Sequence, residues 1–240
     1  MGGRLIQCHS LEWFFPLPER HSLYIPPSHA ERSAEVLLDF IDAHPLGLLV
    51  TASAGELLAT HLPLVLDRSR GAQGLLEGHV ARANRHHSVQ PDGEALVIFS
   101  GPDAYITPAW YATKAAHGKV VPTWNYVAVH AYGELRFVND RAFLRRHLEA
   151  LVARHETGRE PPWSITDAPA EYIDRLEHAI IAFEFTITRL EGKWKMSQNR
   201  SSADIDGVIA GLSQSQDAND RAVARIVANR RPPIPPVQGD

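Results

Sequence analysis

The sequence has a single cysteine and no long apolar run. Cys8 has no second cysteine with which to form an internal disulfide, which fits a reducing compartment. No apolar stretch of the 240 residues approaches the length that a membrane-spanning helix requires. Residues 1–18 also lack the continuous apolar segment of a secretory signal peptide. We therefore expect a cytoplasmic protein without a membrane partner.

Motifs for metal ions and for dinucleotides are missing as well. The chain has 13 histidines, yet it contains no pair of cysteines and no H-E-x-x-H motif, and His86 and His87 are adjacent rather than one helical turn apart. It contains no G-x-G-x-x-G motif and no internal repeat with the period of a solenoid. We expect no metal site.

The charge balance argues against a broad nucleic-acid-binding surface. The chain carries 24 Lys and Arg residues against 28 Asp and Glu residues, a formal net charge of -4, although a local basic patch remains compatible with this balance. Hydrophobic residues make up 44% and charged residues 22% of the chain, which is ordinary for a globular protein with a sizeable core.

Apolar patterning predicts short antiparallel strands and a few helices. Ser28 and Glu31 form a capping-box pattern, which predicts that a helix begins at Ser28. Ala54-Gly55 joins two strands as a hairpin, and Pro63 places the second of them at an edge or a bulge. Residues 180–190 alternate apolar and polar, as in a barrel wall with one buried and one wet face. Together these signals favour a small β barrel with peripheral helices, a mainly β fold of the α+β type. The expected strands are residues 46–53, 57–66, 75–80, 95–100, 126–138 and 180–190, and the later helices are a helix over 140–156, a short one after Pro169, and two over 202–212 and 217–229.

Residues 101–135 hold a dense aromatic segment that we predict to be a stiff loop at the rim of the sheet. Three prolines within it restrict the backbone. Its ring faces either close the end of the β core or form a pocket for a flat ligand, whose polar edge the Tyr hydroxyls, the indole N–H and the Asn125 amide can meet. The five aromatic residues are Tyr105, Trp110, Tyr111, Trp124 and Tyr126.

Two clusters of hydrogen-bond donors follow predicted strands. Arg82 and Asn84 come directly after the strand over residues 75–80, and residues 193–200 (KWKMSQNR) come directly after the strand over 180–190. Guanidinium, ammonium and amide groups at strand ends suit a phosphate. Ordinary solvated turns have the same composition, so the residues alone leave both interpretations open.

Four segments resemble the PaiB family of FMN-binding proteins, which are described as negative transcriptional regulators. Residues 121–126 (VPTWNY), preceded by residues 108–111 (PAWY), carry the closest likeness. Residues 78–84 (GHVARAN), residues 192–200 (GKWKMSQNR) and the start at Tyr24-Ile25-Pro26 match as well. The chain departs from the family pattern at residues 85–87 (RHH), where a proline and an aromatic residue are usual.

The resemblance implies a fold, a cofactor and a partner. The fold is the Greek-key FMN-binding split barrel, and the partner is a second copy of the chain in a homodimer with flavin at the subunit interface. The similarity covers residues 24–212, which we take as the flavin-binding domain. Residues 1–23 are an extension without assigned function, and residues 213–240 are a C-terminal helix and a Pro-rich tail.

The same resemblance assigns candidate flavin-binding residues. Arg82, Lys195 and Arg200 are expected to bind the phosphate. Asn84, Ser197 and Gln198 are expected to donate hydrogen bonds, and Trp124, Asn125 and Tyr126 are expected to contact the ring. No nucleophile with a base and an orienting group can be assembled from the spacing, so no catalytic residue is predicted.

Three functions remain open at this point. The first is a flavin-binding regulator of transcription that acts on DNA either directly or indirectly, since no helix-turn-helix is recognisable. The second is an FMN-dependent oxidoreductase that uses a reduced nicotinamide, which can reach a flavin without a Rossmann domain. The third is a haem-binding split barrel, for which His61, His79 and His130 are the candidate ligands.

Overall fold

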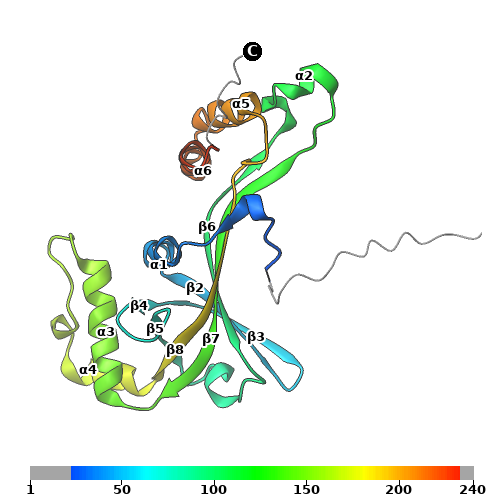
Figure 1. The fold of residues 1–240 in the computed structure, drawn as a ribbon. Helices are drawn as coiled ribbons and strands as arrows, with labels where there is room; N and C mark the ends of the chain where they lie inside the picture. Colours follow the sequence, from blue (N-terminus) through cyan, green and yellow to red (C-terminus); the bar gives the residue numbers. More distant parts are fainter. Residues whose placement is uncertain (1–22, 233–240) are drawn as a thin grey trace, which may run out of the picture.

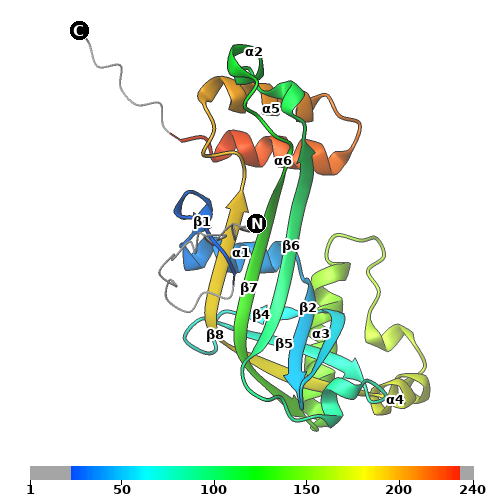
Figure 2. The same ribbon diagram turned by 90° about the vertical axis from the view of Figure 1, so that its right-hand side faces the viewer.

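The computed structural model describes residues 23–232, and its centre is one antiparallel eight-stranded sheet. The strand order is β3-β2-β6-β7-β8-β5-β4 (Figure 1). β1 pairs with residues 192 and 193 of β8, beyond the part of β8 that pairs with β5 (Figure 2). Among the described strands this path does not close on itself, so the sheet is a split barrel, and the predicted mainly β fold with peripheral helices is confirmed. The strands are β1 Ala30–Glu31, β2 Leu46–Ser53, β3 Glu56–Pro63, β4 Val65–Asp67, β5 Leu75–Ala81, β6 Ala95–Ile106, β7 Thr123–Val138 and β8 Ile180–Lys195.

The helices pack along the sheet and at its two ends. Figure 1 shows α1, α3 and α4 on one side of β7 and β8, and Figure 2 shows α5 and α6 stacked beside α2 at the opposite end from α3 and α4. None of the described helices is long and apolar enough to span a bilayer. The α-helices are α1 Ala34–Ala43, α2 Thr113–His117, α3 Arg141–Glu156, α4 Ala170–His178, α5 Ser202–Ser213 and α6 Ala218–Asn229, and the short 3-10 turns are η1 Pro27–His29, η2 Arg85–Ser88, η3 Pro108–Trp110 and η4 Ile165–Asp167.

Most predicted helix starts are confirmed, but the first is wrong. Asp140 caps α3 and Asp217 caps α6, each through hydrogen bonds from backbone N–H groups of the first turn. The first helix begins at Ala34, and Ser33 rather than Ser28 is its cap. Ser28 instead lies in η1, and Glu31 belongs to β1, which pairs with β8. Pairing with the sheet therefore overrides the local capping pattern.

β6, β7 and β8 are each at least three residues longer than the sequence patterns predict, and β7 begins at Thr123 rather than at residue 126. β6 continues through residues 101–106, because a register shift between Ser100 and Asp103 places Pro102 at a bulge where no ladder hydrogen bond is required of it. β8 continues to Lys195, because β7 pairs with it on one edge and β1 on the other. The aromatic segment is thus two strand ends with a short helical connection rather than one loop.

The polar face of β8 is also covered. Glu184 is buried, although the alternation of residues 180–190 predicts an exposed side chain there. Arg70 forms an ion pair with it at 2.5 Å, and Arg136 forms a second one. On this face the Glu184 carboxylate is therefore paired with guanidinium groups instead of being exposed to water.

One hydrophobic core joins the sheet to the C-terminal helices. Val97, Phe99 and Phe183 of the sheet are fully buried, and Val208 of α5 and Val223 of α6 belong to the same cluster. α6 therefore packs with the body formed by residues 24–212. The N-terminal extension up to residue 22 and the Pro-rich tail from residue 233 lie outside the described residues.

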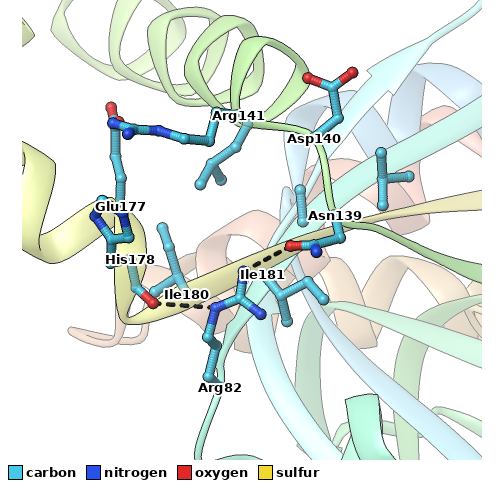
Figure 3. Close-up of a pocket in the computed structure, with 11 residues that line it drawn as sticks. Arg82, Asn139, Asp140, Arg141, Glu177, His178, Ile180 and Ile181 are labelled. Carbon is cyan, nitrogen blue, oxygen red and sulfur yellow. Dashed lines mark hydrogen bonds and ion pairs between the residues drawn. The ribbon is translucent and has the colours of Figure 1, made fainter.

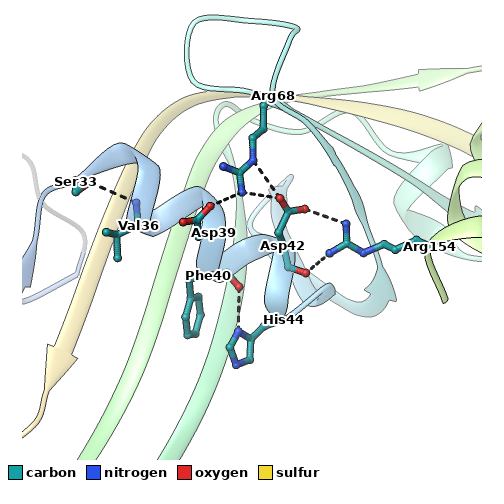
Figure 4. A network of polar contacts seen from close by, with 8 residues as sticks. All are labelled: Ser33, Val36, Asp39, Phe40, Asp42, His44, Arg68 and Arg154. Carbon is teal, nitrogen blue, oxygen red and sulfur yellow. Dashed lines mark hydrogen bonds and ion pairs between the residues drawn. The ribbon is translucent and has the colours of Figure 1, made fainter. Parts of the chain in front are cut away.

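A polar network fixes α1 over the sheet (Figure 4). Arg68 bridges Asp39 and Asp42 with N···O distances of 2.7 and 2.6 Å. Arg154 of α3 forms a 2.9 Å ion pair with the same Asp42. Because α1 follows β1 and η1 directly, this network also steadies the segment that carries His29.

Candidate functional site

Seven residues line a hollow of about 110 Å³ where β7 begins and β8 ends. Three chain segments meet there: η1, the first residues of β7, and the turn that follows β8. The antiparallel register brings the two strands together, since Tyr126 pairs with Lys195. The lining residues are His29, Thr123, Asn125, Lys195, Ser197, Asn199 and Arg200.

The hollow is positively charged. Among the described residues neither Lys195 nor Arg200 forms a salt bridge: Lys195 Nζ donates a 2.6 Å hydrogen bond to Thr123 Oγ1, and the Arg200 guanidinium lies 4.6 Å from the centre of the Tyr111 ring. Burial lowers the pKa of Lys195, and the neighbouring charges of Lys193 and Arg200 lower it further. Cations that form no salt bridge suit an anionic ligand.

The turn after β8 is held in an unusual backbone conformation. Ser197 has a φ of 62°, a left-handed value that non-glycine residues rarely adopt. The Asn125 amide secures it, because Asn125 Nδ2 lies 3.0 Å from Ser197 Oγ, and both side chains are buried. Such strain persists only where surrounding contacts enforce it, and it is concentrated at functional sites.

Gln198 supports the site rather than lining it. Its Nε2 donates to the Trp194 carbonyl at 2.6 Å, and its Oε1 accepts from Met196 N at 2.7 Å. The same Oε1 lies 3.0 Å from His29 Nδ1. His29 is thus a site residue that the sequence interpretation missed. It comes into place through the pairing of Ala30 with Lys193, a contact 163 positions apart in the chain that no local motif signals.

The predicted ring-binding aromatics flank the hollow without lining it. Trp124 is 54% exposed and packs edge-on against Tyr105 at 5.9 Å between ring centres. The Tyr126 ring lies 5.3 Å from Lys193 Nζ. Their faces are available beside the hollow, on the strand that also carries Asn125.

Arg82 and Asn84 lie at the other end of the sheet. Arg82 Nε donates to the His178 carbonyl at 3.0 Å, and its Nη2 donates to Asn139 Oδ1 at 2.8 Å, beside a small hollow of about 40 Å³ (Figure 3). Asn84 caps η2 and donates to Thr60 Oγ1 at 3.0 Å. β7 runs between the two regions, so one chain does not bring these residues to Lys195.

The three candidate haem ligands do not converge either. His61 is exposed on the edge strand β3, while His130 Nδ1 lies 3.2 Å from the Tyr132 hydroxyl. His79 Nδ1 lies 3.1 Å from Nε2 of the fully buried His147. Within residues 23–232 no three His, Cys, Asp or Glu side chains are grouped as metal ligands.

The fold and these residues can be set against known proteins. The family described as "Putative FMN-binding domain" matches residues 23–189. The uncharacterized protein AN0679 of Emericella nidulans is 36% identical, an alignment that covers 87% of this chain and 97% of that protein. The protease synthase and sporulation protein PAI 2 of Bacillus subtilis is 28% identical over 87% of this chain and 98% of its own length.

A solved structure supports the fold. The flavocytochrome Anf3 from Azotobacter vinelandii superposes with a TM-score of 0.51 at 17% sequence identity and covers 69% of this chain and 68% of its own. At this identity the likeness concerns the fold alone. With a family match over most of the chain and relatives aligned along nearly their whole length, the protein belongs to the PaiB-like family of FMN-binding proteins.

Proposed function

We propose that this protein binds FMN with the phosphate in the hollow between η1, β7 and β8. The observation that carries this proposal is the pair of cations, Lys195 and Arg200, which line one hollow and form no salt bridge among the described residues. The Asp204 carboxylate interacts with Arg200 electrostatically without forming an ion pair. Ser197 and Asn125 stand beside them as hydrogen-bonding groups. This set fits the oxygens of a phosphate monoester, which accept charge-assisted hydrogen bonds.

The flavin ring requires more room than the hollow offers. At about 110 Å³ the hollow is smaller than the roughly 300–1,000 Å³ of ordinary small-molecule sites. The ring therefore lies outside it, on the side of Trp124 and Tyr126, and is enclosed by a second protomer. When bound, FMN supplies the redox chemistry of its ring, and the protein supplies position and charge.

An apolar outer face of the sheet supports a homodimer. Alternate residues of β2 and β6 point into the core, as Leu49 and Val97 do, and those between them point outward and are only partly covered. The registers of β3 with β2 and of β2 with β6 place these outward residues side by side. This outer sheet face comprises Leu46, Leu48, Val50, Leu57, Leu96 and Ile98.

Arg82 and Asn84 remain predicted flavin ligands only in such a dimer. Within one chain they lie at the opposite end of β7 from Lys195, so their predicted role requires a second copy that places them beside the first copy's hollow. Neither side chain lines the hollow, which makes them weaker candidates than Lys195 and Arg200.

The regulatory role is the part of the proposal that the site geometry supports least directly. The name of the Bacillus subtilis relative concerns protease synthesis and sporulation. We propose a flavin-responsive regulator that acts on transcription through its dimer, with DNA bound directly or through another protein. A salt-dependent shift of promoter DNA tests direct binding, whereas oxidation of NADH by the flavin-loaded protein favours the oxidoreductase instead.

The absorption spectrum after incubation with FMN tests the cofactor. Two flavin bands that remain after gel filtration support the proposal, whereas an intense Soret band after reconstitution with haem favours the haem alternative. No retained chromophore with either compound contradicts both.

Matched variants test the phosphate site. Lys195→Gln and Arg200→Gln each remove one positive charge, so each is expected to weaken FMN binding about 10- to 100-fold. Binding of riboflavin, which lacks the phosphate, stays unchanged. Lys114→Gln removes an exposed charge from α2 and serves as the control. Equal losses for FMN and riboflavin would contradict the assignment of the phosphate to this hollow.

A further inference from the structure

His29 lies on the wall of the positively charged hollow with its tautomer fixed. The side chain is 7% exposed, and its Nδ1 is 3.0 Å from Gln198 Oε1. That oxygen also accepts a hydrogen bond from Met196 N, while the Gln198 amide nitrogen donates to the Trp194 carbonyl, so the orientation of the Gln198 amide is determined. Nδ1 of His29 therefore carries the proton it donates, and in the neutral ring Nε2 is an unprotonated acceptor.

Burial and neighbouring cations disfavour the protonated form of this ring when no anion is present. Burial lowers the pKa of His29, and the ammonium groups of Lys193 and Lys195 on β8 lower it further, against the raising effects of Gln198 and the Ser28 backbone. Arg200 adds a third positive charge to the wall of the same hollow. No carboxylate among the described residues forms an ion pair with His29. A fourth positive charge is therefore unfavourable until a negative ligand arrives.

We propose that His29 is a proton-coupled ligand of the anion in this hollow, so that a phosphate group binds together with one proton. The proton comes from solvent and forms a new N–H bond at Nε2. The resulting imidazolium donates from both nitrogens, to Gln198 through Nδ1 and to a phosphate oxygen through Nε2. For FMN as the ligand this inference rests on the proposed function; for inorganic phosphate it does not.

Proton coupling fixes the direction of the pH dependence. A bound anion raises the pKa of His29 above its value in the free protein. Between these two values the affinity falls about tenfold for each unit of rising pH, and it is strongest below the pKa of the free protein, where the ring is protonated in both states. The phosphate of FMN itself ionises near pH 6, so its contribution has to be removed by comparison with a variant.

His29→Gln provides that comparison, because glutamine keeps a hydrogen-bonding amide but does not titrate. FMN affinities are measured by flavin fluorescence between about pH 5.5 and 8.5, the range in which histidine titrates. The ratio of wild-type to His29→Gln affinity is expected to fall at least about tenfold across this range. Calorimetry in two buffers with different ionisation enthalpies is expected to show that the wild type takes up as much as one proton more than the variant. His155→Gln, an exposed position on α3, is the control and keeps the wild-type profile.

The outcomes separate this inference from the proposed function. Equal proton uptake and parallel pH profiles in wild type and His29→Gln overturn the role of His29 while leaving FMN binding intact. If the wild type binds no FMN, the proposed function fails. The inference is then decided by titration with inorganic phosphate, followed through the imidazole NMR signals that His29→Gln lacks: a raised pKa of His29 supports it, and an unchanged pKa overturns it.

Discussion

His147 of α3 is a fully buried histidine inside the protein. Its Nε2 lies 3.1 Å from His79 Nδ1, and its Nδ1 has no hydrogen-bond partner among the described residues. The nearest carboxylate, that of Glu77, is 3.9 Å away, which is too far for a hydrogen bond. Burial, together with the neighbouring His79, lowers the pKa of His147 to about 4.

This burial predicts acid sensitivity. In the unfolded chain the histidine has a pKa of about 6.5, so the unfolded state binds its proton first as the pH falls. Stability does not depend on this group above pH 6.5 and is lost between pH 6.5 and about 4, by about 3 kcal/mol in total. Urea unfolding at several pH values measures the loss.

His147→Gln removes this titration and is expected to reduce the pH dependence between pH 6.5 and 4. His79, His86 and His130, whose pKa values burial also lowers, retain the remainder. The control is His178→Gln, because the His178 side chain is 60% exposed. A wild-type slope that persists in His147→Gln, or that disappears in His178→Gln, would show that another group causes the acid sensitivity.

Individual residues of the site could be predicted only where they belong to a local sequence motif. Asn125, Lys195, Ser197 and Arg200, which the resemblance names as flavin ligands, line one hollow, since three of them share the short segment of residues 195–200. Their role toward flavin stays a prediction. The three residues of that segment meet Asn125 because β7 pairs with β8. The order of the motifs in the sequence is compatible with this pairing but does not specify it. His29 could not be predicted, because only the β1–β8 pairing brings it there.

The packing of α5 on η3 illustrates how a neighbouring helix supports the site. Gly207 and Gly211 of α5 face Trp110: a Cβ on Gly207 would lie 1.9 Å from the Trp110 carbonyl oxygen, and one on Gly211 would lie 2.3 Å from its ring. Asp204 of the same helix accepts hydrogen bonds from Thr113. The helix thereby holds the segment that carries Tyr111, on which Arg200 rests.

Gly211→Ala is therefore expected to destabilise the protein, although glycine to alanine in a helix normally stabilises it by about 1 kcal/mol. Overpacking against the Trp110 ring predicts a loss of about 1–3 kcal/mol in the free energy of unfolding. Urea unfolding of a double-mutant cycle with Trp110→Ala checks the cause. In the Trp110→Ala background the substitution becomes neutral or stabilising. A loss of the same size in both backgrounds would contradict the contact.

Strand positions were predicted better than strand lengths. The β2–β3 hairpin around Ala54-Gly55 and the edge position of β3, which contains Pro63, are confirmed. Local patterns end β6 at the Gly101-Pro102 pair, where a bulge in fact lets the strand continue. They also end β8 before the basic residues, because a polar composition is typical of loops. β8 nevertheless continues, because β1 and β7 pair with its two edges. The length of a strand depends on which strands pair with it, and a single sequence does not show that pairing.

The proposed homodimer would link the two halves of the proposed flavin site. In one chain the hollow holds room for a phosphate and the aromatic side chains beside it remain open, with Trp124 54% exposed. The outer sheet face offers a partly exposed apolar surface on the same sheet, including Leu46 at 63% and Leu57 at 78% exposure. If the face pairs two copies, FMN affinity and dimerisation depend on each other.

Charges on the outer sheet face test this link. The double variant Leu46→Lys/Leu57→Lys places two ammonium groups per protomer on the proposed interface while leaving the buried core intact. Dimerisation buries them opposite each other, so we expect the dimer to weaken at least about 100-fold and to sediment as a monomer at micromolar concentration. FMN affinity falls with it, because each site loses its second wall. The double variant Tyr172→Lys/Leu176→Lys on α4, at 48% and 47% exposure, introduces the same charge elsewhere and leaves both properties unchanged. A wild-type protein that binds FMN fully as a monomer would place the whole site within one chain.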